Sequence, residues 1–592
     1  MTIHNDKKLV FYQIYLQIHK MPDITDKTDI INSNDDDNNY KQRKKTFSII
    51  NIWHIFCHLL IPGDTDEDGG ALIYRSKLVL IFIISLFVIL TIKLVLILKN
   101  DVYKHRYYQY NSKQPFSRVS IVDRNGKILS HNISVFTLYL QASKIDNFSK
   151  EIDKINKVIP NAITDKNKII KKLEKRKTSN RTIFIKKNLS IQQKQALIDS
   201  GVQGLVFEDD EKRFYTSRPA NNIVGYCPSN NNCISGIEKG ENEYLTVPNN
   251  QPLRLSIDNV AQTILRDILN EKVINTQSKG ASGVIMKIDT GEIIAGVSIP
   301  DCDYNNYELC SPESLFNNYS LGVYELGSVF KLFLAATALQ YGISPYKAYK
   351  REEYRLGNFV IHDIDRKEQQ GGQLNLIDTI RISSNVGCAK IVEDIDLFYQ
   401  FKYLANLGIL TKLDTELPES GRPIYPKKWT LINGITASYG HGIATTPLNF
   451  ASAIASLLNN KPVKPTFIAT DAPIETENYT YLDEDKIDVF KDIMRQVVNA
   501  GGGNKAYIDE YDIGGKTGTA MQIKNGKYDK YSNILSFVAV LPMYKPEYVF
   551  FITLNYPKVD DANIYKTRGY ELGSVMNQII STIGPILNIK PI

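Results

Sequence analysis

The sequence is poor in the side chains that metalloenzymes and histidine-dependent hydrolases need. Its 592 residues contain only 8 histidines and 6 cysteines. After residue 250 the histidines are His362 and His441, and neither lies in a G-x-S-x-G or H-E-x-x-H pattern. No group of residues has the spacing of a metal site. We therefore expect neither a metal nor another cofactor, and we expect His441 to have a structural role.

A concentration of charge of one sign is also missing. The net charge of +7 is spread along the chain, which gives no indication of nucleic-acid binding. The length exceeds that of one ordinary domain, so two or more domains are expected.

One long apolar run is present, from Leu78 to Leu98, with Lys93 as its single charge. This length is sufficient to span a bilayer, and Lys93 is close enough to the end to extend to the interface. No small-residue cleavage site follows, which indicates an uncleaved signal anchor. Charges next to the run favour a cytoplasmic C-terminal side, whereas the basic cluster 41–45 favours the reverse. We place the large C-terminal part outside, because large domains are translocated largely regardless of charge and the chemistry below requires an external substrate.

Composition divides the rest of the chain into three parts. Residues 1–77 are polar and include a tract, Asn34–Asn39, typical of disorder, and an apolar segment, 47–61, too short to span a membrane. Residues 99–250 are mixed α/β, with a hairpin turn at Asn125-Gly126. Two lysine-rich stretches in this part, Ile152–Val158 and Lys166–Lys177, are expected to be helices with a solvated face.

The third part, residues 251–592, has strand patterns at both ends and helical patterns between them. A helix is expected over Ile257–Leu269. Strands are expected over Ser282–Ile288, Ile293–Ile299, Ile513–Ile523, Asn533–Leu541 and Tyr548–Tyr556. This arrangement predicts an α+β fold in which distant segments close one antiparallel sheet, with helices packed on it.

Three short motifs occur in a fixed order within this part: Ser328-Val329-Phe330-Lys331, Ser383-Ser384-Asn385 and Lys516-Thr517-Gly518-Thr519. Each alone is a weak signal. Together they match the set S-x-x-K, a second Ser/Asn motif and K-T-G. They predict a serine enzyme that opens an amide by acyl transfer.

The first motif supplies a nucleophile and a base. Ser328 precedes an apolar, helix-forming stretch that ends at Gly342, so it is expected to open a buried helix. Lys331 follows three residues later and is expected to reach the Ser328 oxygen from the same face. Burial and a second cation, Lys516, would lower the pKa of Lys331, which must be neutral to accept a proton.

The second motif is expected at the end of a helix over Leu374–Ile382. Its ordinary interpretation is a cap or turn. Its functional interpretation is a relay in which Ser383 passes a proton between Lys331 and a leaving amine, while Asn385 binds the substrate backbone.

The third motif lies in an expected strand, where Gly518 indicates that another backbone approaches closely. A substrate peptide added as a strand is one such approach. Lys516, Thr517 and Thr519 are expected to bind a carboxylate, and the Thr519 and Ser328 amides to form an oxyanion hole. A phosphate-binding loop is rejected because its first glycine would fall at Glu510.

At this point the sequence resembles the class B, monofunctional penicillin-binding proteins, and within them the septal, division-type transpeptidases. The resemblance covers roughly residues 118–560. It departs from the family at Leu326, where many relatives have proline, and at Asn222, where a histidine is frequent. The segments that carry it are Val122-Asp-Arg-Asn-Gly126, Gly236-Ile-Glu-Lys239, Asp289-Thr-Gly-Glu292, Tyr324-Glu-Leu-Gly-Ser-Val-Phe-Lys331, Ser383-Ser-Asn385, Tyr439-Gly-His-Gly442, Gly514-Gly-Lys-Thr-Gly-Thr-Ala520 and Ser536-Phe-Val538.

The resemblance implies four regions: a cytoplasmic segment at 1–77, a signal anchor at 78–98, a pedestal of the dimerisation type at 99–250 and a transpeptidase domain at 251–592. The last has the penicillin-binding and serine β-lactamase-like α+β fold, an antiparallel sheet with helices on both sides. It also implies a single-pass protein of the bacterial inner membrane whose catalytic domain is periplasmic.

The activity implied is cross-linking of peptidoglycan stem peptides that end in D-Ala-D-Ala, through acylation of Ser328, with D,D-carboxypeptidase as a side activity. β-Lactams would acylate the same serine. The partners implied are stem peptides on nascent glycan, the membrane, a separate glycosyltransferase and other division proteins, and no nucleic acid. An elongation-type transpeptidase, a catalytically silent division scaffold and a β-lactam-hydrolysing or β-lactam-sensing relative stay open as alternatives.

Export would allow two local disulfides, Cys227–Cys233 and Cys302–Cys310, and the alternative is that these cysteines are free. Cys388 lies in an apolar run after the second motif and is expected to be a small core residue.

Overall fold

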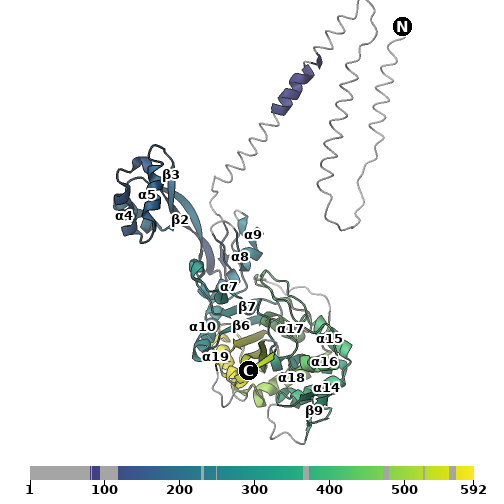
Figure 1. Cartoon of the computed structure of the whole chain (residues 1–592). Helices are drawn as coiled ribbons and strands as arrows, with labels where there is room; N and C mark the ends of the chain where they lie inside the picture. Colours follow the sequence, from purple (N-terminus) through teal and green to yellow (C-terminus); the bar gives the residue numbers. More distant parts are fainter. Residues whose placement is uncertain are drawn as a thin grey trace, which may run out of the picture. The chain divides into compact units, whose positions relative to one another are not determined.

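The computed structural model describes residues 80–81, 83–93, 118–228, 232–247, 250–363, 372–470, 479–524, 527–558 and 568–592. The chain forms two compact units, residues 1–112 and 113–592. In the first unit, residues 80–81 and 83–93 are helical (Figure 1). Within the described ranges, no helix has the length and hydropathy needed to cross a bilayer. The predicted span 78–98 extends beyond these ranges, and the predicted tract 34–39 and apolar segment 47–61 lie outside them.

The second unit begins with a head lobe, residues 128–215, built on a long strand, β2 (Ile128–Gln141). Strands β3 (Thr182–Leu189) and β4 (Leu205–Tyr215) both pair antiparallel with β2. Three helices pack on the lobe and bury its apolar side chains: α4 (Phe148–Val158), α5 (Lys166–Glu174) and α6 (Ile191–Asp199). Asn147, Asp165 and Ser190 cap their N-termini through side-chain oxygens, which explains where each helix begins. Both predicted lysine-rich helices are thereby confirmed (Figure 1).

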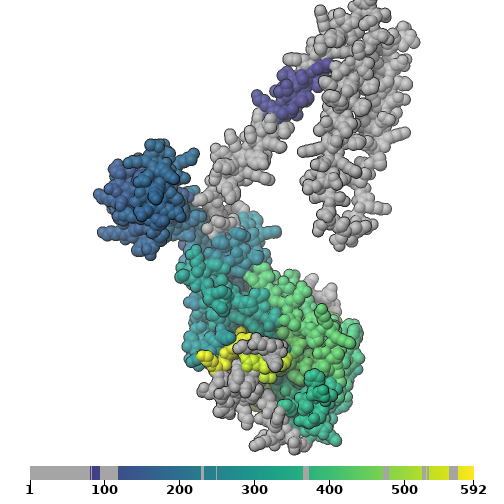
Figure 2. All heavy atoms as spheres, in the orientation of Figure 1, coloured from purple at the N-terminus to yellow at the C-terminus, as the bar shows by residue number. Residues whose placement is uncertain are grey.

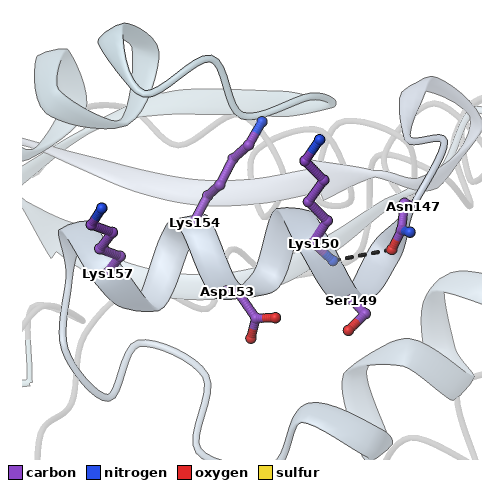
Figure 3. A pocket seen from close by; sticks show the side chains of 6 residues that line it. All are labelled: Asn147, Ser149, Lys150, Asp153, Lys154 and Lys157. Carbon is purple, nitrogen blue, oxygen red and sulfur yellow. Dashed lines mark hydrogen bonds between the residues drawn. The ribbon is translucent and has the colours of Figure 1, made fainter.

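The head lobe also corrects the expectation that positive charge is spread evenly. Residues 144–199 contain 15 Lys and Arg against 6 Asp and Glu, a local surplus larger than the net charge of +7 for the whole chain. Some of these lysines surround a shallow hollow along α4, where Lys150, Lys154 and Lys157 are drawn in Figure 3. Lys154 is neutralised by Glu151 and also donates to the Gly201 carbonyl. The hollow is part of the head lobe and contains none of the three motifs.

The base of the pedestal contains the predicted hairpin and a buried ionic cluster. Strand β1 (Ile121–Val122) pairs with β2 across the turn at Asn125-Gly126, where Gly126 has φ +82°. Glu238 accepts from Arg118 at 2.9 Å and from Arg213 at 2.6 Å, and these three side chains are at most 1% exposed. The short elements here are η2 (Arg218–Ala220), α7 (Asn221–Val224), α8 (Gly236–Gly240), α9 (Asn242–Thr246) and β5 (Leu253–Arg254).

The predicted catalytic lobe, residues 251–592, is built on one antiparallel sheet whose strand order is β12-β13-β14-β6-β7. The strands are β6 (Gly280–Lys287), β7 (Ile293–Ile299), β12 (Gly514–Lys524), β13 (Lys527–Leu541) and β14 (Tyr548–Asn555). All eight residues of β14 are buried, because it is the central strand and is covered on both faces. The predicted closure of one sheet by distant segments is confirmed.

Successive side chains along the sheet enter two separate cores. On β14, Phe550 and Ile552 pack with α10 (Asn259–Asn275) and α19 (Arg568–Ile583). Phe551 points to the opposite face and packs with α12 (Lys331–Tyr341), α17 (Pro447–Asn459) and α18 (Glu484–Ala500). Helices therefore cover both faces of the sheet, as predicted. In Figure 2 the yellow C-terminal segment lies at the surface beside the teal segment that contains α10.

The remaining elements surround the second face of the sheet or connect the lobes. They are η1 (Ala142–Lys144), η3 (Tyr304–Leu309), α11 (Pro312–Leu315), η4 (Gly327–Phe330), β8 (Tyr349–Lys350), β9 (Tyr354–Leu356), β10 (Phe359–Ile361), β11 (Gln373–Leu374), α13 (Leu376–Arg381), α14 (Asn385–Glu393), α15 (Leu397–Asn406), α16 (Leu431–Ser438) and η5 (Asn504–Ala506).

Both candidate disulfides, Cys227–Cys233 and Cys302–Cys310, are formed. Cys388 is free and buried, as predicted. The two disulfide loops are joined by Tyr226 and Tyr307, whose rings stack with centroids 4.1 Å apart. Cys227, Cys233 and Glu238 are the one group of described residues close enough to hold a metal ion, but the two sulfurs are bonded to each other.

Candidate active site

Ser328 lies in the 3-10 turn η4, directly before helix α12, which begins at Lys331. The predicted position at the start of a buried helix is therefore correct to within one turn, and Gly342 ends the helix in the left-handed conformation, as expected. The turn is held tightly: a Cβ on Gly327 would lie 2.4 Å from the Thr519 carbonyl oxygen. Ser328 itself is partly exposed. Its hydroxyl makes no hydrogen bond to any residue that the structure describes.

Lys331 is completely buried and donates to the second motif. Its Nζ lies 2.5 Å from the Ser383 carbonyl oxygen, 3.1 Å from Ser383 Oγ and 2.8 Å from Asn385 Oδ1. Burial lowers the pKa of Lys331, and the nearby Cys388 and Asp363 oppose this effect. The expected bond between Lys331 and the Ser328 hydroxyl is not formed; Lys331 is instead linked to Ser383 and Asn385.

The second motif lies between two helices. The helix expected over 374–382 is observed as α13, and Asn385 begins the next helix, α14. Ser384 is the N-cap of α14 and accepts from the Gly387 amide at 2.9 Å. Ser383 has φ +61°, an uncommon conformation for a residue other than glycine, found here where its side chain meets both lysines. The motif is thus both a cap and part of the polar cluster.

The third motif brings a second buried lysine to the same point. Lys516 is 1% exposed, and its Nζ donates to Ser383 Oγ at 3.0 Å and to the Thr517 carbonyl at 3.1 Å. Its pKa is lowered well below the ordinary value, first by burial and then by the charge of Lys331. Ser383 Oγ therefore accepts from two lysine amines that come from a helix and a strand far apart in the sequence.

Strand β12, which carries this motif, is at the edge of the described sheet and pairs there only with β13. Thr517 and Thr519 are partly exposed on it. Gly518 is buried instead, and a Cβ at this position would lie 2.2 Å from Ser536 Oγ and 2.5 Å from the Leu326 carbonyl. The predicted close approach is correct, since backbone of this chain at Leu326 lies against Gly518. The added peptide strand stays a prediction.

His441, expected to be structural, packs between aromatic rings next to this cluster. Its ring lies 5.7 Å from those of Tyr439 and Tyr528, and burial lowers its pKa. The loop that carries it contacts the nucleophile turn directly, since the Gly327 amide donates to the Gly440 carbonyl at 3.3 Å.

Sequence reasoning missed one buried residue of the site, Asp363. It follows β10 and accepts from the Ser384 hydroxyl at 2.7 Å and from the Asn385 amide at 2.6 Å. No motif marks this position in the sequence.

The three predicted motifs thus meet in one cluster, and comparison with known proteins agrees with this arrangement. The family described as penicillin binding protein transpeptidase domain matches residues 281–581, and the penicillin-binding protein dimerisation domain matches residues 113–245. The chain belongs to the class B penicillin-binding proteins. This penicillin-binding protein is of the division type.

The alignments with similar curated proteins extend over most of this chain and most of each relative. A probable peptidoglycan D,D-transpeptidase FtsI of Caulobacter vibrioides is 30% identical over 80% of this chain and 82% of its own. Peptidoglycan D,D-transpeptidase FtsI of Escherichia coli is 26% identical over 80% of this chain and 84% of its own. Stage V sporulation protein D of Bacillus subtilis is 22% identical over 80% of this chain and 79% of its own.

Proposed function

We propose that this penicillin-binding protein is a serine-type D-Ala-D-Ala transpeptidase that cross-links peptidoglycan stem peptides during septal wall synthesis. One observation carries the proposal: Ser383 Oγ accepts from both Lys331 and Lys516, at 3.1 and 3.0 Å, beside the turn that bears Ser328. Two neighbouring buried amines cannot both be charged without a large cost, which favours a neutral base at neutral pH.

In the first step Ser328 Oγ attacks the carbonyl carbon of the penultimate D-alanine. The hydroxyl proton goes to neutral Lys331, and the amides of Ser328 and Thr519 stabilise the oxyanion. The C–N bond to the terminal D-alanine then breaks. Ser383, between the two lysines, passes the proton to the leaving amine, so that free D-alanine departs and an ester on Ser328 remains.

In the second step an amine on a neighbouring stem attacks this ester. The new C–N bond forms, the bond to Ser328 Oγ breaks, and the proton lost by the amine returns to Ser328 through the same lysine and serine groups. Water in place of the amine would give D,D-carboxypeptidase activity. Asn385 orients the donor backbone in both steps.

The outer edge of β12, which pairs with no other strand that the structure describes, offers the donor stem a place to bind as an added strand. Thr517 and Thr519 are partly exposed there, and the Lys516 amine donates both to the Thr517 carbonyl and to Ser383 Oγ. These groups bind the terminal carboxylate of the stem. Gly518 serves the same site indirectly, because its lack of a side chain lets β12 approach Leu326 beside the nucleophile turn.

The remaining functions belong to separate regions of the chain. Residues 78–98 anchor the protein in the inner membrane as a single span, 1–77 stay cytoplasmic, 99–250 form the periplasmic pedestal and 251–592 the transpeptidase domain. A separate glycosyltransferase polymerises the glycan, and other division proteins bind the non-catalytic regions. The long apolar run 78–98 and the match of the dimerisation domain to residues 113–245 support this division.

Mass spectrometry of the intact protein after treatment with penicillin tests the proposal. One adduct is expected, and it should map to the peptide that contains Ser328. Ser328→Ala should abolish it. Ser574→Ala is the matched control, because Ser574 is exposed on the outer face of α19 and its hydroxyl bonds to the Glu571 carbonyl of the same helix. An adduct that persists in Ser328→Ala contradicts the proposal, and complementation of a depletion strain by Ser328→Ala would favour the scaffold alternative.

A further inference from the structure

Asp363 occupies a position behind the second motif that the mechanism above does not use. It follows β10, is 6% exposed and accepts hydrogen bonds from three consecutive residues. Oδ2 accepts from the Ser384 hydroxyl at 2.7 Å, whereas Oδ1 accepts from the amides of Asn385 at 2.6 Å and Val386 at 3.1 Å. The carboxylate thus satisfies the first amides of α14, where a negative charge is also stabilised by the helix dipole.

The contacts of Asp363 continue to the candidate base. One of the three residues that it fixes, Asn385, carries an acceptor for Lys331, because Asn385 Oδ1 lies 2.8 Å from the lysine amine. The other two acceptors belong to Ser383, which directly precedes these three residues. A buried carboxylate with several amide and hydroxyl donors is held in one orientation, so it restricts the backbone to which those donors belong.

We propose that Asp363 is a positioning residue of the transpeptidase: its carboxylate fixes the start of helix α14, and with it Asn385 and the preceding Ser383, against Lys331, and it supplies a negative charge close to Lys331. This inference rests on the proposed function. Asp363 does not touch the substrate; it acts through the second motif and through its electric field.

Several charged and titratable groups, including Asp363, lie around Lys331 and affect its pKa. They are Lys516 on β12, Cys388 on α14, Asp363 after β10 and His441 between α16 and α17. Asp363 raises the pKa of Lys331 in opposition to burial. Arg351 partly neutralises Asp363, since its Nε lies 3.7 Å from Oδ2.

The test measures acylation by a fluorescent penicillin as a function of pH in the full-length protein. Asp363→Asn keeps the shape but loses the charge and one acceptor. We expect the acylation rate constant to fall at least about tenfold. We also expect the acid limb of its pH profile, the range in which the rate falls with decreasing pH, to move to lower pH. The control is Asp378→Asn, which removes a carboxylate from the neighbouring helix α13 that pairs with Arg381 on the surface. Asp378→Asn should change neither the acylation rate constant nor the pH position of the acid limb.

Two further variants keep the proposal testable if Asp363→Asn does not fold. Ser384→Ala should slow acylation without moving the limb, because the charge stays. Arg351→Gln should move the limb to higher pH, because Asp363 is then less neutralised. An unchanged rate, or a slower rate with an unmoved limb in Asp363→Asn, overturns the proposal, as do unchanged Ser384→Ala and Arg351→Gln proteins. Failure of the wild-type protein to be labelled would instead contradict the proposed function.

Discussion

At the scale of single residues, the chemistry depends on where two lysines are buried. Lys331 and Lys516 are both removed from water, and each disfavours the charge of the other. A folded-state pKa below that of free lysine means that the neutral, basic form is populated at lower pH. Acylation should therefore rise as pH increases through this lowered pKa and be lost as pH falls below it.

The charge of Lys516 is expected to set the position of this pH limb. Lys516→Met keeps an unbranched side chain but removes the cation, so the pKa of Lys331 should rise and the acylation limb should move to higher pH. The rate constant at pH 7 should fall about tenfold or more, since a carboxylate contact is lost as well. Stopped-flow acylation between pH 5 and pH 9 measures both effects. A limb that stays in place would show that Lys516 does not act on the base.

Gly518 permits a second residue-scale prediction. Gly518→Ala would place a Cβ 2.5 Å from the Leu326 carbonyl, which belongs to backbone and cannot rotate away. We expect a loss of about 1–3 kcal/mol in the free energy of unfolding and slower acylation, because β12 must move from the nucleophile turn.

Gly502→Ala is the control for this change. The nearest atom to its added Cβ is Thr517 Oγ1 at 3.6 Å, an ordinary contact, so stability should change little. Denaturant unfolding and penicillin labelling measure the two effects. Equal behaviour of the two variants would show that the close packing of β12 on η4 is dispensable.

At the scale of elements, periodicity predicted the core strands of the catalytic lobe because β6, β7, β14 and residues 533–541 of β13 bury nearly every side chain. The expected bounds of β6, β7 and β14 agree with the observed ones to within two residues, whereas β13 begins at Lys527 and not at Asn533 as expected. The three motifs were sufficient to predict that Lys331, Ser383 and Lys516 would meet. Local patterns could not specify the partner of Lys331, because that depends on the positive φ of Ser383 and on how α13 and α14 join.

Asp363 illustrates the same limit. A single aspartate after a short strand carries no periodic or motif signal, and its role depends on the packing of β10 on the N-terminus of α14. The closely packed Gly518 shows the reverse case: the sequence predicted a close backbone, but both a ligand and the chain itself satisfy that pattern.

The ionic cluster at the base of the pedestal gives a prediction at this scale, because it joins three separate segments. Glu238 on α8 binds Arg118 before β1 and Arg213 on β4, and all three are buried. Glu238→Gln leaves two buried guanidinium groups without their carboxylate. Removing one partner of such a cluster typically costs about 3–5 kcal/mol. We expect a loss of that size in the free energy of unfolding.

Glu243→Gln on α9 is the matched control, because Glu243 is exposed, and it should be close to neutral. Acylation at 25 °C should be retained in both variants, since the cluster does not contact the three motifs. A stable Glu238→Gln protein would indicate that the two arginines find other acceptors.

At the scale of the whole molecule, the site and the proposed anchor belong to different compact units. Every residue of the candidate site lies in 113–592, whereas the apolar run 78–98 lies in 1–112. Loss of the first unit should therefore remove membrane attachment without removing chemistry. The full-length protein is expected in the membrane fraction, resistant to high salt and released by detergent. A variant that lacks residues 1–112 should be recovered in the soluble fraction.

The same truncated variant should be acylated by penicillin with a rate constant within about twofold of the full-length value, because no group that acts on Ser328 is lost. Ser328→Ala in the truncated background controls for non-specific labelling. Recovery of the full-length protein in the soluble fraction would contradict the anchor. Loss of acylation on truncation would instead show that residues 1–112 stabilise the catalytic lobe, although every buried core residue that the structure describes in this lobe lies in 113–592.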